Sequence, residues 1–218
     1  IDEFEYYAQQ CFENFGDLVK KWFSAVEAGI TIKLGYQFMN HPPFVSDFKR
    51  FTQAMFNWFL CNAKFVRAFK QANITGDVGT LHVVHTTYPM GSRSEDIEAA
   101  NIEDMLDRRV YLDVYIKGEI PSDVWDFWKK HNVTPNFEES DLQLIKDNTI
   151  TLLGLNYYSV SRVRAPQFAK NPNAPLHLNH FVEHMQSPAG GRKAYGREIY
   201  EKGLLDALYS IRDEYDNF

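Results

Sequence analysis

Three short runs of β-branched and apolar residues, separated by helical patterns, constrain the fold of this 218-residue chain most strongly. The runs cover residues 23–27, 80–86 and 149–156. Strands that alternate with helices normally pair in parallel, joined by right-handed crossovers that pack the helices against the sheet. The alternation therefore predicts an α/β protein with a parallel sheet.

Helical patterns fill most of the remaining sequence. Residues 2–21 place apolar side chains at steps of three and four, and a second helix is expected from Ser46 or Asp47, either of which can cap it, to residue 71. Further helices are expected over 94–109 and 201–214, and from residues 121 and 140. The segments expected to be irregular are the loop 35–43, the turn 76–79, the apolar linker 110–116 and the long loop 160–195.

The carboxyl ends of the three predicted strands carry polar side chains. Glu27, His85 and the pair Asn156 and Tyr158 stand at these ends, where parallel sheets place their chemistry. Long connections with extra helices are typical of a (β/α) barrel, but three strands cannot close a barrel that needs eight. We therefore expect residues 1–218 to form one domain, a partial barrel with two open edges that another polypeptide covers.

Composition excludes several classes of protein. The formal net charge of −6 argues against nucleic-acid binding, because phosphate contacts need clustered Lys and Arg. Cys11 and Cys61 lie in helical patterns and are expected to be reduced thiols of a cytoplasmic protein. The sequence contains no apolar run of about 18 residues, so it predicts no transmembrane helix, and we expect no membrane partner. Residues 1–5 resemble neither a signal peptide nor a natural start.

Several motifs occur in a specific order along the chain. They are residues 7–23, Leu34-Gly35-Tyr36, His41-Pro42-Pro43, Ser94-Glu95-Asp96, Gly118-Glu119-Ile120-Pro121, Leu153-Gly154-Leu155-Asn156-Tyr157-Tyr158 and Gly196-Arg197-Glu198-Ile199-Tyr200. In this order they resemble the middle portion of glycoside hydrolase family 1, the retaining β-glycosidases. Residues 162–166 and 196–203 are most similar to the bacterial 6-phospho-β-glucosidase branch.

The resemblance implies about the fourth to sixth strands of a (β/α)8 TIM barrel, acting on a β-glycoside or a phosphorylated disaccharide. Retaining hydrolysis uses two carboxylates about 5–5.5 Å apart, one as acid/base and one as nucleophile. Glu27 matches the acid/base position of the family's Asn-Glu-Pro motif, while His85, Asn156 and Tyr158 match positions that line the sugar site. We expect no cofactor and no metal.

The chain also departs from the family pattern. Val26 replaces the motif's Asn, which contacts the sugar 2-hydroxyl, and Ala28 replaces its Pro. Arg197 replaces a Trp. The sequence ends at Phe218, before the strand that carries the family's nucleophile, and the first three strands are also missing. The resemblance therefore implies that this chain is inactive alone.

Two hypotheses about function follow. In the first, the chain is a piece of a β-glycosidase that acts on 6-phospho-β-glucosides, and it works only when the missing strands are supplied in trans or by the full-length gene. In the second, it is a truncated or redesigned scaffold that is not catalytic, in which Val26 and Arg197 mark lost sugar contacts. Such a scaffold would bind sugar or self-associate over its open edges.

The remaining histidines have competing interpretations. His177, His180 and His184 suggest a metal site, but they lack a framework of Cys or acidic ligands and fall in a loop. His82 and His85 are three residues apart, so within one strand they point to opposite faces. We expect His85 to face the barrel interior.

The nearest feature to a basic patch consists of Arg162, Arg164, Lys170, Arg192, Lys193 and Arg197. Within it, Arg162 and Arg164 either steer an anionic sugar phosphate or form a solvated pair at a strand end.

Overall fold

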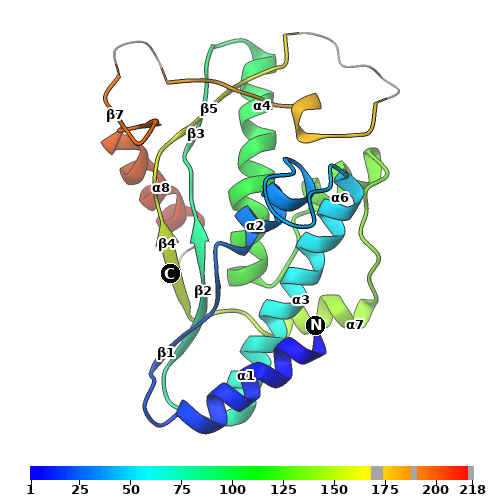
Figure 1. The fold of residues 1–218 in the computed structure, drawn as a ribbon, viewed down its shortest axis with the longest axis vertical. Coiled ribbons are helices and arrows are strands. Elements are labelled where there is room, and N and C mark those ends of the chain that lie inside the picture. The colour runs from blue at the N-terminus through cyan, green and yellow to red at the C-terminus, as the bar shows by residue number, and fades with distance from the viewer. Residues whose placement is uncertain (168–173, 188–190, 216–218) are drawn as a thin grey trace.

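The structure is a computed structural model that describes residues 1–167, 174–187 and 191–215, with helices and strands alternating along the chain (Figure 1). The helices are α1 (Asp2–Phe15), α2 (Ala28–Tyr36), α3 (Phe48–Ala72), α4 (Ser94–Asp104), α5 (Val110–Leu112), α6 (Ser122–Lys130), α7 (Glu139–Asp147), α8 (Glu201–Glu214), the π-helical η1 (Met105–Arg109) and η2 (Asp113–Lys117), and the 3₁₀ helix η3 (Leu178–His180). The strands are β1 (Lys21–Val26), β2 (Asp77–Val83), β3 (Thr87–Pro89), β4 (Leu152–Asn156), β5 (Ser161–Arg164), β6 (Glu183–His184), β7 (Lys193–Ala194) and β8 (Arg197–Glu198).

The three predicted strands form one parallel sheet in the order β1-β2-β4. Lys21 lies opposite Asp77, and Asn156 lies opposite Val83. Because Lys21 already belongs to the sheet, α1 ends at Phe15 rather than at residue 21. The parallel sheet is confirmed, and its strands begin and end within a few residues of the predicted bounds.

The turn expected over residues 76–79 is wrong beyond Gly76, because β2 begins at Asp77. Gly79 lies opposite Leu152 of β4. A Cβ atom on Gly79 would lie 1.6 Å from the Leu152 carbonyl oxygen. This glycine therefore allows two strands to approach closely instead of forming a turn.

The linker expected over residues 110–116 is helical, so that prediction is wrong. The chain continues from α4 through η1, α5 and η2 without leaving helical conformation. Val110, Leu112, Val114 and Tyr115 are all buried in the core. Val110, Val114 and Tyr115 are β-branched or aromatic, which disfavours a helix only weakly, and packing outweighs this preference.

A second, smaller sheet takes two of its three strands, β5 and β6, from the expected long loop. β3 pairs in parallel with β5, and β5 pairs in antiparallel fashion with β6. Val163 at the centre of β5 is fully buried, which gives this short strand an apolar anchor. Residues 168–173 and 188–190 of the expected loop, including Lys170, lie outside the described residues.

Helix α3 is the longest helix in the described part of the chain, and it packs against α1 and the sheet (Figure 1). Asp47 caps it: the Asp47 carboxylate accepts a hydrogen bond from the Arg50 backbone N–H at 3.0 Å. Phe48, Met55, Phe56 and Phe59 are buried along its length. The helix expected to begin at Ser46 or Asp47 is thus confirmed, with Asp47 as the cap.

We expect Asp47→Ala to lower the stability of the chain by about 1 kcal/mol, because one amide of the first turn of α3 loses its acceptor. Thermal unfolding should then begin about 2–4 °C lower. Asp47→Asn keeps a capping side-chain oxygen and serves as the matched control. An equal loss in both variants would show that charge, not capping, is the contribution of Asp47.

The sheet has two edge strands, β1 and β4, and apolar side chains remain exposed near its ends. They include Phe23 and Val26 on β1 and Leu204, Leu205, Leu208 and Tyr209 on α8.

Cys11 and Cys61 are free and half-buried. None of the helices in the described part of the chain combines the length and the hydropathy that a membrane crossing requires.

Candidate active site

Strand β1 places Glu27 at the carboxyl edge of the sheet, where the backbone changes direction into α2. The Glu27 N–H donates to the Leu81 carbonyl of β2 at 2.9 Å, which extends the strand pairing. The φ angle of Glu27 is 56°, a left-handed conformation that residues other than glycine rarely adopt and that recurs at functional sites. The Glu27 side chain does not cap α2. Its carboxylate is therefore available to groups on neighbouring strands.

Asn156 and Tyr158, at the end of β4, both reach the Glu27 carboxylate. The Asn156 Nδ2 group donates to Glu27 Oε1, and the Tyr158 hydroxyl donates to the same oxygen at 2.9 Å. Asn156 Nδ2 and the Tyr158 hydroxyl are 3.3 Å apart. Because the Tyr158 hydroxyl donates a hydrogen bond to the Glu27 carboxylate, the pKa of Tyr158 is raised above its ordinary value. The structure thus brings together three of the four predicted site residues.

The two oxygens of Glu27 have different surroundings. Oε1 accepts two hydrogen bonds, whereas no donor in the described part of the chain bonds Oε2. Glu27 itself is half-buried. A carboxylate with one oxygen fixed and the other open can exchange a proton with a molecule that arrives at the strand ends.

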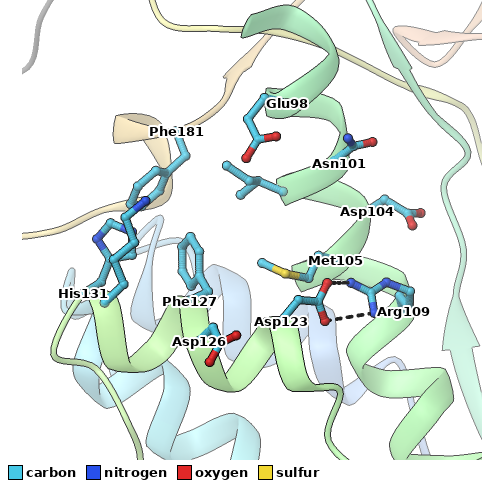
Figure 2. Close-up of a pocket in the computed structure, with 12 residues that line it drawn as sticks. Glu98, Asn101, Asp104, Met105, Arg109, Asp123, Asp126, Phe127, His131 and Phe181 are labelled. Carbon is cyan, nitrogen blue, oxygen red and sulfur yellow. Dashed lines mark hydrogen bonds and ion pairs between the residues drawn. The ribbon is translucent and has the colours of Figure 1, made fainter. Parts of the chain in front are cut away.

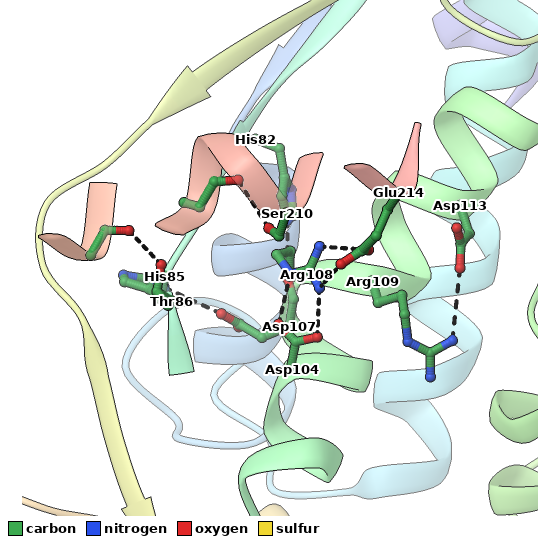
Figure 3. A network of polar contacts seen from close by, with 12 residues as sticks. His82, His85, Thr86, Asp104, Asp107, Arg108, Arg109, Asp113, Ser210 and Glu214 are labelled. Carbon is green, nitrogen blue, oxygen red and sulfur yellow. Dashed lines mark hydrogen bonds and ion pairs between the residues drawn. The ribbon is translucent and has the colours of Figure 1, made fainter. Parts of the chain in front are cut away.

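The fourth predicted residue, His85, contacts a different carboxylate. Its Nδ1 lies 3.2 Å from Asp107 Oδ2, while His82 Nε2 lies 3.0 Å from the Asp107 carbonyl oxygen (Figure 3). Burial lowers the pKa of His82. Both histidines therefore reach Asp107, and the expectation that they point to opposite faces is wrong. Alternation of faces holds only within a strand, and β2 ends at Val83.

Asp107 belongs to a buried ionic network that the sequence analysis missed. The Lys33 ammonium lies 2.8 Å from Asp107 Oδ1 and 2.9 Å from Glu103 Oε1. His184 Nε2 lies 2.9 Å from the same Glu103 oxygen. The only sequence signal was local: the acids at 103 and 107 are four residues apart, on one side of a helix. Their partner on α2 is about seventy residues distant and leaves no such signal.

In this network, the attraction between opposite charges shifts the pKa values more strongly than burial does. Burial alone would raise the pKa of Glu103 and Asp107, but the Lys33 ammonium holds both below their ordinary range, helped by hydrogen bonds from His184 and His85. Burial alone would lower the pKa of Lys33, and the two carboxylates instead raise it. All three groups are therefore ionised near neutral pH.

A neighbouring salt bridge holds α8 against the helix that carries Asp107 (Figure 3). The Arg108 guanidinium contacts Asp104 at 2.7 Å and Glu214 at 3.0 Å. The Thr86 hydroxyl donates to the Gly203 carbonyl at 2.6 Å, near the other end of α8. These contacts place the last described helix beside the strand ends.

The arginines of the expected basic patch have separate surroundings. Arg162 forms a bidentate pair with Glu198 at 2.7 Å, and Arg164 pairs with Glu183 at 2.9 Å. Neither is therefore part of a solvated pair of two arginines. Arg197 lies with its guanidinium 4.7 Å from the centre of the Tyr158 ring, and no carboxylate in the described part of the chain pairs with it.

The histidines suggested as metal ligands have other partners. His177 Nε2 lies 2.6 Å from the Gln37 carbonyl oxygen, and His180 Nδ1 contacts the backbone of His177. His184 lies on β6 and contacts Glu103, so His180 and His184 do not share a helix. Over residues 1–167, 174–187 and 191–215, no three His, Cys, Asp or Glu side chains are placed to hold a metal ion.

A pocket that Glu27 does not line lies between α4 and α6 (Figure 2). Its volume is about 580 Å³, and its floor includes Met105, Phe127 and Phe181. The Arg109 guanidinium in its wall is paired with Asp123. The pocket contains none of the residues predicted for the sugar site.

Comparison with known proteins decides the family. The model of glycosyl hydrolase family 1 matches residues 1–218. The chain belongs to this family. The 6-phospho-beta-glucosidase GmuD of Bacillus subtilis (strain 168) is 36% identical over 220 residues, which covers 100% of this chain and 47% of the relative. Beta-glucosidase A of Acetivibrio thermocellus is 30% identical over 214 residues, covering 98% of this chain and 46% of the relative.

Solved structures of family 1 confirm the fold. A family 1 b-glucosidase from Thermotoga maritima superposes with a TM-score of 0.83 at 26% identity, covering 99% of this chain and 45% of that chain. The same organism's beta-glucosidase in complex with deoxynojirimycin gives the same score. The predicted partial (β/α)8 barrel is confirmed. The chain spans about half the length of the curated relatives it matches.

We expect Tyr158→Phe to lower kcat/KM of any glycosidase activity that depends on Glu27 roughly three- to tenfold, because Oε1 loses one of its two donors. Tyr209→Phe removes an exposed hydroxyl from α8 and is the matched control. Unchanged kinetics in Tyr158→Phe would mean that the bond to Glu27 does not contribute to the reaction. Steady-state kinetics on a polypeptide that contains the remaining strands provides the measurement.

Proposed function

We propose that residues 1–218 form the central part of a retaining β-glycosidase in which Glu27 is the acid/base. The observation that carries this proposal is the Glu27 carboxylate at the strand ends, with Oε1 held by Asn156 and Tyr158 and Oε2 open. Family membership supplies the reaction class, because retaining β-glycoside hydrolysis requires a carboxylic acid in such a position.

The proposed mechanism has two steps. In the first, Glu27 donates a proton to the glycosidic oxygen while a second carboxylate, about 5–5.5 Å away, attacks the sugar. In the second, Glu27 removes a proton from the water that releases the sugar. Glu103 and Asp107 do not suit the role of nucleophile, since Lys33 binds both of them. We assign the nucleophile to polypeptide outside residues 1–218, so the chain alone is inactive.

The substrate class we favour is the 6-phospho-β-glucosides. GmuD of Bacillus subtilis is a 6-phospho-beta-glucosidase, and a Clostridium acetobutylicum relative, 31% identical over 234 residues, is a 6-phospho-beta-galactosidase. The Arg197 guanidinium above Tyr158, without a carboxylate partner in the described part of the chain, provides positive charge beside Glu27.

His85 remains a proposed sugar-site residue. The free cysteines support a cytoplasmic location.

A second candidate function is a scaffold without catalysis. Val26 is 62% exposed beside Glu27, where it cannot donate the hydrogen bond of the family's Asn. The apolar surface of β1 and α8 would then be covered by a second copy or by a complementing barrel fragment. Size-exclusion chromatography with light scattering measures whether the chain associates.

The deciding experiment compares hydrolysis of p-nitrophenyl 6-phospho-β-glucoside and p-nitrophenyl β-glucoside. The polypeptide completed with the remaining strands should prefer the phosphorylated substrate and release the β-anomer first, as seen by NMR, whereas residues 1–218 alone should release nothing. Arg197→Met should raise KM for the phosphorylated substrate only, with Arg212→Met on α8 as control. A folded, completed barrel that binds sugar without turnover would support the scaffold instead.

A further inference from the structure

The pocket between α4 and α6 combines an apolar floor with a charged rim (Figure 2). Ile102, Met105, Phe127 and Phe181 supply the apolar surface, and Ile102 and Phe181 are only half-buried. The volume of about 580 Å³ lies in the range of roughly 300–1,000 Å³ that is typical of sites for small organic ligands. The proposed glycosidase mechanism uses none of these residues.

Three rings form one end of the pocket. The ring centres of Phe127 and Phe181 are 5.1 Å apart, and the His131 ring lies 4.6 Å from that of Phe127. Burial lowers the pKa of His131, so its imidazole is neutral near pH 7 and adds aromatic surface rather than charge. Aromatic rings pack well against such rings and against the sulfur of a methionine such as Met105. The apolar part of the pocket therefore suits an aromatic ligand.

Two of the acids that line the pocket already have partners. Asp104 accepts hydrogen bonds from the Arg108 guanidinium at 2.7 and 2.8 Å. Asp123 accepts from the Arg109 guanidinium, as the dashed lines in Figure 2 show. The charge of Arg109 is thereby offset, so this arginine opposes the approach of a cation only weakly.

Three charged side chains of the pocket have no ion-pair partner within residues 1–167, 174–187 and 191–215. They are Glu98 on α4 and Asp126 and Lys130 on α6, and all three are exposed to solvent. Lys130 follows Asp126 by four residues on the helix and can offset only one of the two acids. One negative charge is left over. The Glu98 carboxylate points from α4 toward the apolar floor, where a ligand can reach it (Figure 2).

We propose that this pocket binds an arylalkylamine, an aromatic ring joined to a primary ammonium by a short alkyl chain. The ring packs against Met105, Phe127 and Phe181, and the ammonium pairs with the Glu98 carboxylate. A single positive charge on the ligand balances the charge that Asp126 and Lys130 leave uncompensated. Because Glu98 is exposed, water screens the ion pair, and the preference for a cation is modest.

Two compounds that differ at one group test the proposal on the chain itself. Tryptamine carries an ammonium where tryptophol carries a hydroxyl, and the two have the same number of non-hydrogen atoms. In isothermal titration at about pH 7.5 and low ionic strength, we expect tryptamine to bind at least about threefold more tightly than tryptophol. Ethylamine lacks the ring and should bind at least about tenfold more weakly than tryptamine. Equal affinities of tryptamine and tryptophol, or no binding of tryptamine, would overturn the proposal.

Variants locate the site. Glu98→Gln should weaken binding of tryptamine by about threefold and change binding of tryptophol by less than about twofold. Glu95→Gln makes the same change in charge at an exposed residue of α4 that does not line the pocket, and it should leave both affinities unchanged. Asn101→Trp places a large side chain at the exposed rim and should weaken both ligands by about tenfold or more.

A competing site for the amine is the carboxylate at the strand ends. Glu27→Gln should change tryptamine binding by less than about twofold if the pocket is the site. Binding that depends on Glu27 and not on Glu98 or Asn101 would refute the assignment. No glycosidase activity is needed for any of these measurements.

Discussion

Glu27→Gln should lower kcat/KM for p-nitrophenyl 6-phospho-β-glucoside by roughly 10²- to 10⁴-fold in the completed polypeptide, because general acid/base catalysis contributes about that factor. Glutamine has nearly the same shape as glutamate. Its side-chain carbonyl oxygen can still accept the hydrogen bonds from Asn156 and Tyr158 that the Glu27 carboxylate accepts. The variant therefore removes the exchangeable proton while preserving the local structure.

The leaving group makes this prediction specific to proton donation. A 2,4-dinitrophenolate leaves without protonation, so Glu27→Gln should slow its release in the first step much less than it slows release of an alkyl alcohol. Added azide needs no general base to attack the glycosyl-enzyme intermediate and should therefore restore turnover of the dinitrophenyl substrate. Burst kinetics and identification of the glycosyl azide product provide the measurements.

The control for Glu27→Gln is the same substitution at a carboxylate remote from the strand ends. Glu119 is exposed and lies beyond η2, near the segment that leads into β4. Glu119→Gln should leave kcat/KM unchanged. A loss in Glu27→Gln that is equal for good and poor leaving groups would contradict the acid/base role and leave Glu27 as a residue that only positions the substrate.

The parallel sheet and the cluster of polar residues around Glu27 could be predicted from the sequence for one reason. Parallel strands deliver their carboxyl ends to a common edge, so residues at those ends meet even when they are far apart in the chain. Glu27 and Asn156 meet in this way across β2, which lies between their strands. The placement requires only strand order and direction, both of which the alternation of patterns indicates.

The ionic network could not be predicted in the same way. Lys33 lies on α2, a helix that the sequence analysis did not identify, and its partners lie on α4 and η1. Pairing of side chains on separate helices depends on how the helices pack, and the hydrophobic periodicity of the sequence does not indicate which side chains will pair. The helical state of residues 110–117 was missed for a related reason, since burial against other elements decided it.

Lys33→Met should destabilise the chain by about 3–5 kcal/mol, because removing one partner of a buried ion pair leaves uncompensated charge. Within residues 1–167, 174–187 and 191–215, Lys33 is the only cationic side chain that pairs with both Glu103 and Asp107, and both acids are nearly inaccessible to solvent. Methionine fills a similar volume, so loss of packing contributes little. Urea unfolding near pH 7 measures the difference.

The same substitution at Lys64 is the matched control. Lys64 pairs with Asp2 and Glu5, and the Asp2 side chain is largely exposed. Water screens such a pair and solvates the carboxylate that remains. Lys64→Met should therefore shift the urea midpoint much less than Lys33→Met, and equal shifts would contradict the importance of burial in the network.

The pH dependence of Lys33→Met follows from the sign of the pKa shifts. In the native chain the pKa values of Glu103 and Asp107 are below their ordinary range, so the network stabilises the fold above about pH 4 and loses that contribution as the pH falls further. Without Lys33, burial raises both pKa values, and the penalty is relieved when the carboxyl groups take up protons. The difference in unfolding free energy between the native chain and the variant should therefore be largest near pH 7 and decrease toward pH 4. A difference that stays constant over this interval would mean that Lys33 contributes packing rather than charge.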